Sequence, residues 1–304
     1  LSWVISNEEF MKNQSVIDFM KLRASFGIIN TDNTPYDGYW NDKMAGGGTY
    51  PVVGGSSYGN GDGGWAEGQL PSVNGTLEKA YKYNVGLDMS LLKGLTFTID
   101  GFYERRSDIW VSASGQNSSV LGIGSPYKNA GRVDSWGTEL GLDYSKRIGD
   151  FQLRLGGTFS FNRNKVIEML EEPKAYDYLT QTGKPIGQIW GLQAIGHFVD
   201  QADIDNSIPQ QFGPVKPGDI KYKDVNGDGV VNDGDIVAIG STSKPNLIYG
   251  LGLSATWKGL DVSLHFQGAG KSQFFTYGKC IWAFTEGQWG NIPVSYTHLT
   301  LPTI

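Results

Sequence analysis

The sequence predicts an all-β protein whose strands form part of a transmembrane antiparallel β-barrel with long extracellular loops. Three observations support this fold class. Apolar and polar residues alternate in several segments, short turns and long loops fall on opposite sides of the predicted strands, and 304 residues include 43 Gly, 15 Tyr, 14 Phe and 9 Trp. This composition suits short strands, many turns and aromatic belts better than packed helices.

Alternation with period two places apolar side chains on one face of a strand and polar side chains on the other. In the first such segment, Met20, Leu22 and Phe26 share one face, whereas Lys21 and Arg23 share the opposite face. We predict about seven strands, each near the ~10 residues that cross a membrane at a tilt. The predicted strands are Met20–Ile28, Tyr81–Leu91, Leu95–Glu104, Trp136–Ser145, Phe151–Asn162, Leu247–Trp257 and Leu260–Gln267.

The connections between these strands are strongly asymmetric. Short turns are expected at Leu92–Gly94, Ile148–Asp150 and Lys258–Gly259, whereas long loops are expected at Ser107–Ser135 and Arg163–Asn246. A barrel with periplasmic turns and extracellular loops produces this asymmetry, and such loops would be unusually long in a β-sandwich. Aromatic residues at strand ends are predicted to form the interfacial girdles: Tyr81, Tyr103, Trp136, Tyr144, Phe151 and Trp257.

Charge, cysteine content and hydropathy argue against a nucleic-acid-binding protein, a disulfide-linked protein and a protein with a membrane-spanning helix. A formal net charge of -6 and a pI near 5.1 argue against a nucleic-acid partner, which would require a basic surface. The single Cys280 leaves no internal disulfide. The sequence contains no run of 18 apolar residues, which excludes a spanning helix and leaves spanning strands possible.

Both ends of the chain look incomplete. The sequence opens at Leu1 without a readable export signal, so we expect a cut N-terminus. Residues Val294–Ile304 resemble the translation of a transposon adapter used in DNA library preparation, and we expect them to be a sequencing artefact. The barrel segment is therefore predicted to comprise residues 1–293.

Four ordered blocks resemble SusC/RagA-type TonB-dependent outer-membrane proteins. The blocks are Asn129–Leu140 (NAGRVDSWGTEL), Gly183–Phe198 (GKPIGQIWGLQAIGHF), Pro217–Gly240 (PGDIKYKDVNGDGVVNDGDIVAIG) and Lys244–Ser272, which begins KPNLIYGLGLSATWKGLDVSLHF.

The resemblance implies one part of a large transport protein. It implies an outer-membrane barrel of ~22 strands with an N-terminal plug, energised by TonB through that N-terminal region. It also implies a SusD-like lipoprotein at the extracellular mouth and uptake of glycans or other oligomeric nutrients such as peptides. No plug domain is recognisable in this sequence, so we expect a C-terminal barrel fragment.

The strongest local motif is a calcium-like loop between Asp224 and Asp235. Oxygen ligands fall at the spacing of an EF-hand loop, and Gly229 occupies the position of its sharp turn. The alternative is a cluster of Asn-Gly and Asp-Gly turns that only shapes a loop, because position 12 is Asp and no helix precedes the motif. The candidate Ca²⁺ ligands are Asp224, Asn226, Asp228, Val230, Asn232 and Asp235.

The sequence offers no catalytic constellation, so we do not expect an enzyme. Gly55–Gly59 matches the nucleophile-elbow pattern but lacks a strand and helix around it, and Gly270–Ser272 lacks the first glycine of a phosphate loop. Glu171 and Glu172 are expected to be a solvated pair. Loop aromatics are better candidates for substrate contact. They are Trp40, Trp65, Tyr127, Trp190, Phe198, Trp282 and Trp289.

Two other functions compete with an importer. The calcium-like loop and the Gly/Asn-rich connections are also compatible with a secreted calcium-binding β-sandwich or adhesion module. A passive porin would share the alternating strands and the uneven loops.

Overall fold

A computed structural model describes all residues except 36, 51–61, 119, 121 and 276–304. No helix among these residues is long and apolar enough to cross a membrane. The only α-helix of the described chain is α1 (Gln201–Asp205), and short 3₁₀ turns lie at residues 5–7, 9–11, 114–116, 177–179 and 233–235. The strands are β1 (Ser2–Val4), β2 (Ile17–Thr31), β3 (Met44–Tyr50), β4 (Asp62–Glu67), β5 (Glu78–Leu91), β6 (Leu95–Ser112), β7 (Tyr127–Ile148), β8 (Phe151–Glu168), β9 (Gln188–Gly191), β10 (Ala194–His197), β11 (Ile220–Tyr222), β12 (Val237–Thr242), β13 (Leu247–Trp257) and β14 (Leu260–Gly270).

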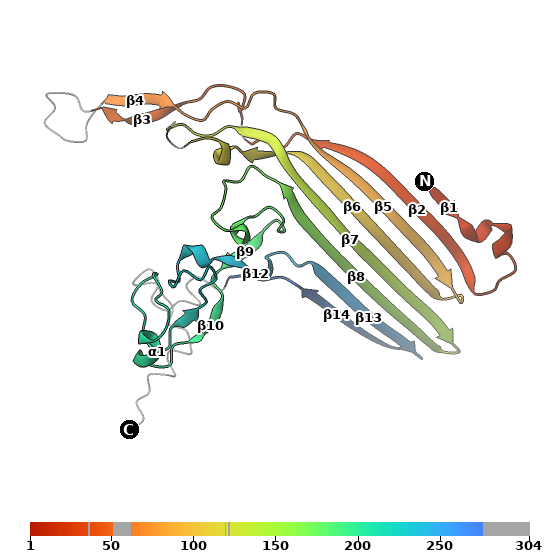
Figure 1. Cartoon of the computed structure of the whole chain (residues 1–304). Coiled ribbons are helices and arrows are strands. Elements are labelled where there is room, and N and C mark those ends of the chain that lie inside the picture. The colour runs from red at the N-terminus through yellow and green to blue at the C-terminus, as the bar shows by residue number, and fades with distance from the viewer. Residues whose placement is uncertain (36, 51–61, 119, 121, 276–304) are drawn as a thin grey trace.

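One curved sheet dominates the structure (Figure 1). Within the described residues it has eight strands in the order β1-β2-β5-β6-β7-β8-β13-β14, and every neighbouring pair is antiparallel. All seven predicted strands are present. The sequence analysis missed only β1 of this sheet, whose three residues are too few to show a period.

The predicted asymmetry of the connections is confirmed. Turns at residues 92–94, 149–150 and 258–259 join strands at one end, which we call the turn end. Leu92 and Lys93 adopt φ values of 53° and 55°, the left-handed conformation that a tight connection requires. The long connections gather at the opposite end, the loop end (Figure 1).

The strands are longer than predicted. β7 has 22 residues and both β6 and β8 have 18, so the loop expected at Ser107–Ser135 narrows to residues 113–126. A strand that continues beyond the membrane is wet on both faces, and it therefore loses the alternation that marks it in the sequence. The prediction of strands near ten residues was wrong for this reason.

The outer face of the sheet is apolar across the strands. Leu22, Leu87, Ile99, Leu140 and Phe159 are successive partners from β2 to β8. Because side chains directly opposite one another lie on the same face, this register forms a continuous apolar row. Such a row suits contact with lipid hydrocarbon.

Aromatic rows flank the apolar part of the outer face. Toward the loop end, the ring centroids of Phe26 and Tyr83 lie 5.0 Å apart, and those of Tyr83 and Tyr103 lie 6.1 Å apart. At the turn end, Phe151 is the register partner of Trp257. These rows match the aromatic girdles of a membrane barrel. The row at the loop end comprises Phe26, Tyr83, Tyr103 and Trp136.

The inner face of the sheet is polar and charged. Arg23 Nε lies 2.8 Å from Asp88 Oδ2, and Arg23 Nη2 lies 2.9 Å from Asp100 Oδ2. Gly86 lies between Arg23 and Asp100 in the register, and a Cβ there would collide with both side chains. This glycine therefore allows one guanidinium to reach two carboxylates on two neighbouring strands.

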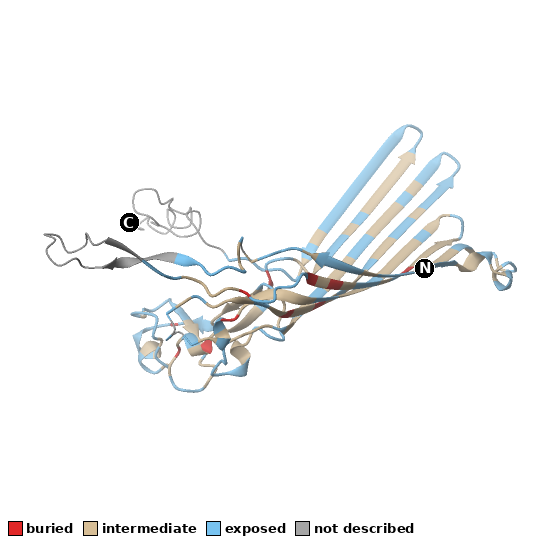
Figure 2. Ribbon diagram, turned by 90° about the horizontal axis from the view of Figure 1, so that it is seen from above, coloured by how far each residue is buried: buried red, intermediate tan, exposed pale blue. Residues whose placement is uncertain are grey.

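The main sheet is a single layer with little buried surface. Figure 2 shows exposed and intermediate residues along the strands, with most buried positions near the loop end. Apart from this sheet, the described residues form only two-stranded sheets: β3–β4, β9–β12 and β10–β11. A β-sandwich needs two packed sheets, so the β-sandwich alternative is wrong.

The connection between β8 and β13 has a small core of its own. Phe198 is 3% exposed, whereas Val231 and Asp235 are fully buried. Phe198 is held by backbone hydrogen bonds with Asp219 and Gly218, and the Lys221 ammonium lies 5.5 Å from the centroid of its ring. Residues 169–246 are therefore a folded insertion at the loop end, not an extended loop.

Candidate functional site at the inner mouth of the sheet

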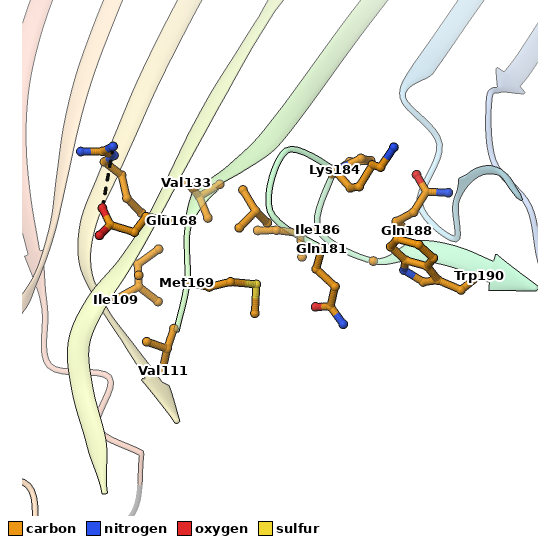
Figure 3. A pocket seen from close by; sticks show the side chains of 15 residues that line it. Ile109, Val111, Val133, Glu168, Met169, Gln181, Lys184, Ile186, Gln188 and Trp190 are labelled. Carbon is orange, nitrogen blue, oxygen red and sulfur yellow. Dashed lines mark ion pairs between the residues drawn. The ribbon is translucent and has the colours of Figure 1, made fainter. Parts of the chain in front are cut away.

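A pocket of about 360 Å³ lies where the insertion meets the inner face of the sheet at the loop end. Val133 on β7 and Val166 on β8 are register partners and form its floor. In Figure 3, Ile109, Val111 and Met169 extend from one side, whereas Ile186 and Trp190 lie on the other. The pocket therefore joins strand and insertion residues that are distant in sequence.

The pocket combines an apolar lining with a charged edge. Its edge carries Arg132 and Glu168, whose Nη2 and Oε2 atoms lie 3.8 Å apart. The buried Nε of Arg132 has no hydrogen-bond partner among the described atoms. Apolar surface with a few fixed polar groups is the usual character of a small-molecule site.

Glu171 fixes the segment that closes the pocket. Its carboxylate accepts hydrogen bonds from the backbone N–H of Gln181 and from both the backbone N–H and the hydroxyl of Thr182, at 2.6–2.9 Å. Burial raises the pKa of Glu171, but these hydrogen bonds lower it by more, so its pKa lies below the ordinary value. The prediction that Glu171 belongs to a solvated pair was wrong, because the side chain is half-buried and bonded.

The predicted substrate-contact aromatics occupy very different places. Trp190 lines the pocket. Tyr127 begins β7, and Trp40 and Trp65 are strongly exposed. Phe198 is buried in the insertion, so its ring is unavailable to a substrate. Trp282 and Trp289 lie outside the described residues, as does the expected adapter segment 294–304.

The calcium-like loop forms a compact turn within the insertion. Asp224 accepts the backbone N–H groups of Gly227 and Gly229 at 2.6 and 2.9 Å. Asn226 accepts the N–H of Asp228, and Asp228 accepts the N–H of Val230. Gly227 and Gly229 have φ values of 75° and 85°, which explains the glycines of the motif.

Asp235 is the last residue of this loop, and its buried side chain holds the loop backbone together. Its carboxylate accepts the N–H groups of Val225, Asn226 and Asn232 at 2.7–3.2 Å. Burial raises the pKa of Asp235, but these backbone donors lower it by more, and the pKa falls below its ordinary value. The hydroxyl of Tyr178 also donates to the carbonyl of Gly234.

The described part of the chain holds no group of three or more His, Cys, Asp or Glu side chains placed to share a metal ion. The candidate ligands have the oxygen chemistry that Ca²⁺ prefers, but in this conformation Asp224, Asp228 and Asp235 accept backbone N–H groups. Ca²⁺ binding at this loop stays a prediction.

Comparison with known proteins decides the family. Residues 15–257 match the family model described as TonB dependent receptor-like, beta-barrel. The chain belongs to this TonB-dependent receptor β-barrel family. It is therefore a wall segment of a bacterial outer-membrane barrel, as the two faces of the sheet require.

Individual TonB-dependent receptors share this segment. TonB-dependent receptor P26 of Formosa agariphila is 26% identical over 305 residues, which cover 94% of this chain and 29% of that receptor. TonB-dependent receptor SusC of Bacteroides thetaiotaomicron is 25% identical over 246 residues, covering 77% of this chain and 23% of SusC. The chain thus spans less than a third of the length of the curated receptors it matches.

Solved structures confirm the fold. The RagAB peptide importer in its open-open state superposes with a TM-score of 0.63 at 14% identity, covering 89% of this chain and 28% of that chain. The RagAB peptide transporter gives a TM-score of 0.60 at 16% identity. The sheet described above therefore has the form of one section of a TonB-dependent barrel wall.

Proposed function

We propose that this chain forms part of an energy-coupled outer-membrane importer of oligomeric nutrients. The observation that carries the proposal is the division of one sheet into an apolar outer face and a charged inner face, with a pocket at the inner mouth. An outer face of this kind meets lipid, and the inner face lines a passage for polar solutes.

The lining of the pocket favours imported oligomers that have both apolar and polar surface. Trp190 and Met169 offer apolar contact, whereas Arg132, Glu168 and Gln188 offer polar groups. Sugar rings and peptide side chains both present such mixed surfaces. Glycans and peptides are therefore the two substrate classes that we propose for the complete transporter.

We further propose two protein partners. TonB would supply energy through a region outside this chain, and a SusD-like lipoprotein would cover the loop end. The support is the folded insertion of residues 169–246, which presents a large surface on the extracellular side, and the likeness of the fold to the RagAB importer.

The decisive experiment measures uptake in cells that carry the full-length gene. We expect loss of uptake of a fluorescent oligosaccharide or peptide after deletion of the gene, and an equal loss after deletion of tonB. Retained uptake without TonB would instead establish a passive porin. Affinity purification of the tagged transporter tests the partner, because a SusD-like lipoprotein should copurify in stoichiometric amount.

A pocket variant links that uptake to the site. Trp190→Ala removes the largest side chain of the pocket lining and should reduce uptake, whereas Trp40→Ala removes an exposed tryptophan elsewhere at the loop end. If the two variants took up the solute equally at equal surface abundance, the pocket would have no role in transport.

A further inference from the structure

Residues 181–190, which we call the pocket segment, depend on a neighbouring part of the insertion for their position. Gln181 at the start of this segment and Trp190 at its end both line the pocket. Trp190 belongs to β9, and within the described residues β9 pairs with β12 alone (Figure 1). The position of Trp190 therefore depends on the position of β12.

Backbone pairing and side-chain contacts join β12 to β9. Ala238 is the direct partner of Trp190. The side-chain amide of Gln188, another pocket residue, donates to the carbonyl of Ile239 at 3.1 Å. A Cβ on Gly191 would lie 2.8 Å from Cδ1 of Ile239, so the side chain of Ile239 lies against the backbone of β9 at this glycine. A displacement of β12 would consequently move both Trp190 and Gln188.

β12 begins directly after the Asp224–Asp235 loop. Asp235 is fully buried, accepts three backbone N–H groups of the loop and forms a capping box with Asn232. Val237, the first residue of β12, follows Asp235 by two residues. The folded loop therefore determines where β12 starts.

Tyr178 connects this loop to the other end of the pocket segment. Its hydroxyl donates to the carbonyl of Gly234, and its ring stacks on Tyr176 with 5.3 Å between the ring centroids. The turn at residues 177–179 also contacts β12, and Gln181 follows Tyr178 by three residues. Gly234 and β12 thus hold the chain on both sides of the pocket segment.

The hydroxyl of Tyr178 is suited to this connection because it remains a donor. Burial and the nearby Tyr176 and Asp235 raise its pKa above the ordinary value, so the hydroxyl keeps its proton at neutral pH. The carbonyl of Gly234 can only accept, and the hydrogen bond therefore requires that proton. A phenylalanine at position 178 would keep the stacked ring and lose only the connection to the loop.

We propose that Tyr178 is a positioning residue for the pocket. Through Gly234 it fixes the end of the Asp224–Asp235 loop, the loop fixes β12, and β12 fixes Trp190. This inference rests on the proposed function, in which Trp190 contacts the imported oligomer. It adds that the affinity of the pocket depends on a hydroxyl that does not itself line the pocket.

Hydrogen–deuterium exchange of the full-length transporter in detergent measures the positioning without any solute. We expect Tyr178→Phe to speed amide exchange of residues 181–191 about fivefold, which is the factor for one lost neutral hydrogen bond. Tyr222→Phe is the matched control, because Tyr222 lies on β11 of the same insertion and its hydroxyl makes no hydrogen bond within the described residues. Unchanged exchange in Tyr178→Phe, or equal acceleration in Tyr222→Phe, would overturn the inference.

Uptake kinetics of the fluorescent oligosaccharide or peptide connect this position to transport. At equal surface abundance, Tyr178→Phe should raise the half-saturating concentration about threefold and leave the maximal rate unchanged, because it weakens solute binding and not energy coupling. In the Trp190→Ala background the same substitution should have a smaller effect, because Tyr178 acts through Trp190. Two effects that simply multiply, or a lower maximal rate alone, would contradict the positioning role.

The two variants also separate this inference from the proposed function. If Trp190→Ala leaves uptake unchanged, the pocket has no role in transport and the proposed function fails together with the inference. If Trp190→Ala reduces uptake while Tyr178→Phe behaves like Tyr222→Phe, the proposed function stands and only the positioning role of Tyr178 is refuted.

Discussion

Arg23 on β2 and Asp100 on β6 form an ion pair across the intervening strand β5, with 2.9 Å between Nη2 and Oδ2. The same guanidinium binds Asp88 of β5. Three strands are thus joined on the inner face by a single side chain. Charge-assisted hydrogen bonds of this kind are stronger than neutral ones, and the side chains are only partly exposed.

Replacing Arg23 should therefore weaken this part of the wall. We expect Arg23→Gln to lower the free energy of unfolding by about 1–2 kcal/mol, because two facing carboxylates lose their common partner. Urea unfolding of the full-length barrel in vesicles measures the change. Arg154→Gln is the control, since its pair with Asp143 is 3.5 Å long and mostly exposed, and a similar loss there would refute the special role of Arg23.

Introducing one arginine on each face of the sheet tests which face meets lipid. Leu140→Arg should cost about 2–4 kcal/mol, because it moves a guanidinium into the lipid-facing row near the middle of the membrane. Ser160→Arg on the inner face, beside Glu139, should cost little. Equal urea midpoints for the two variants in vesicles would contradict the assigned orientation.

The Glu171 carboxylate should make the pocket sensitive to acid. Because its pKa is lower in the folded protein than in an unfolded chain, its stabilisation is complete above about pH 4.3 and is lost as the pH falls through the lowered value. Amide protection factors at Gln181 and Thr182 should therefore stay constant above about pH 4.3 and drop as the pH is lowered below it. Glu171→Gln should remove this pH dependence, whereas Glu172→Gln should preserve it.

Calcium binding at residues 224–235 predicts protection of a neighbouring trypsin site. Lys223 is exposed directly before the loop. We expect cleavage after Lys223 to slow about tenfold when Ca²⁺ is present at ten times its dissociation constant, because binding stabilises the folded loop. Asp228→Asn should abolish the effect and Asp205→Asn should not; identical cleavage with Ca²⁺ and with chelator would exclude the site.

The membrane-spanning part of the fold was predictable because its side chains alternate between lipid and water, which produces a period of two in the sequence. Leu22, Leu140 and Phe159 face lipid while their neighbours face water, so alternation identified the strands. On the loop-end side of the aromatic row, both faces of a strand meet water, so apolar and polar residues no longer alternate. The extensions of β6 and β7, including Ile109 and Val133, were consequently interpreted as loop.

The site was less predictable, because its residues converge only through the fold. Trp190 was selected by its residue type and its predicted position in an extracellular loop, and it lines the pocket. Phe198 was selected by the same two criteria, but its side chain is buried in the insertion. Glu171 carries no motif, since its three hydrogen bonds depend on a return of the chain ten residues later. The Asp224–Asp235 loop was recognisable because its glycines and Asx residues act locally.

The open sides of the curved sheet have a consequence for handling this segment alone. β14 forms one edge of the sheet, and residues 25–31 of β2 form part of the other edge. The described chain supplies no neighbouring strand along either edge, so rows of backbone N–H and C=O groups are left unpaired there. Such edges recruit other strands. We expect the isolated segment to assemble edge to edge into ribbons, and the missing part of the wall, added as a separate polypeptide, to suppress that assembly by occupying the same edges.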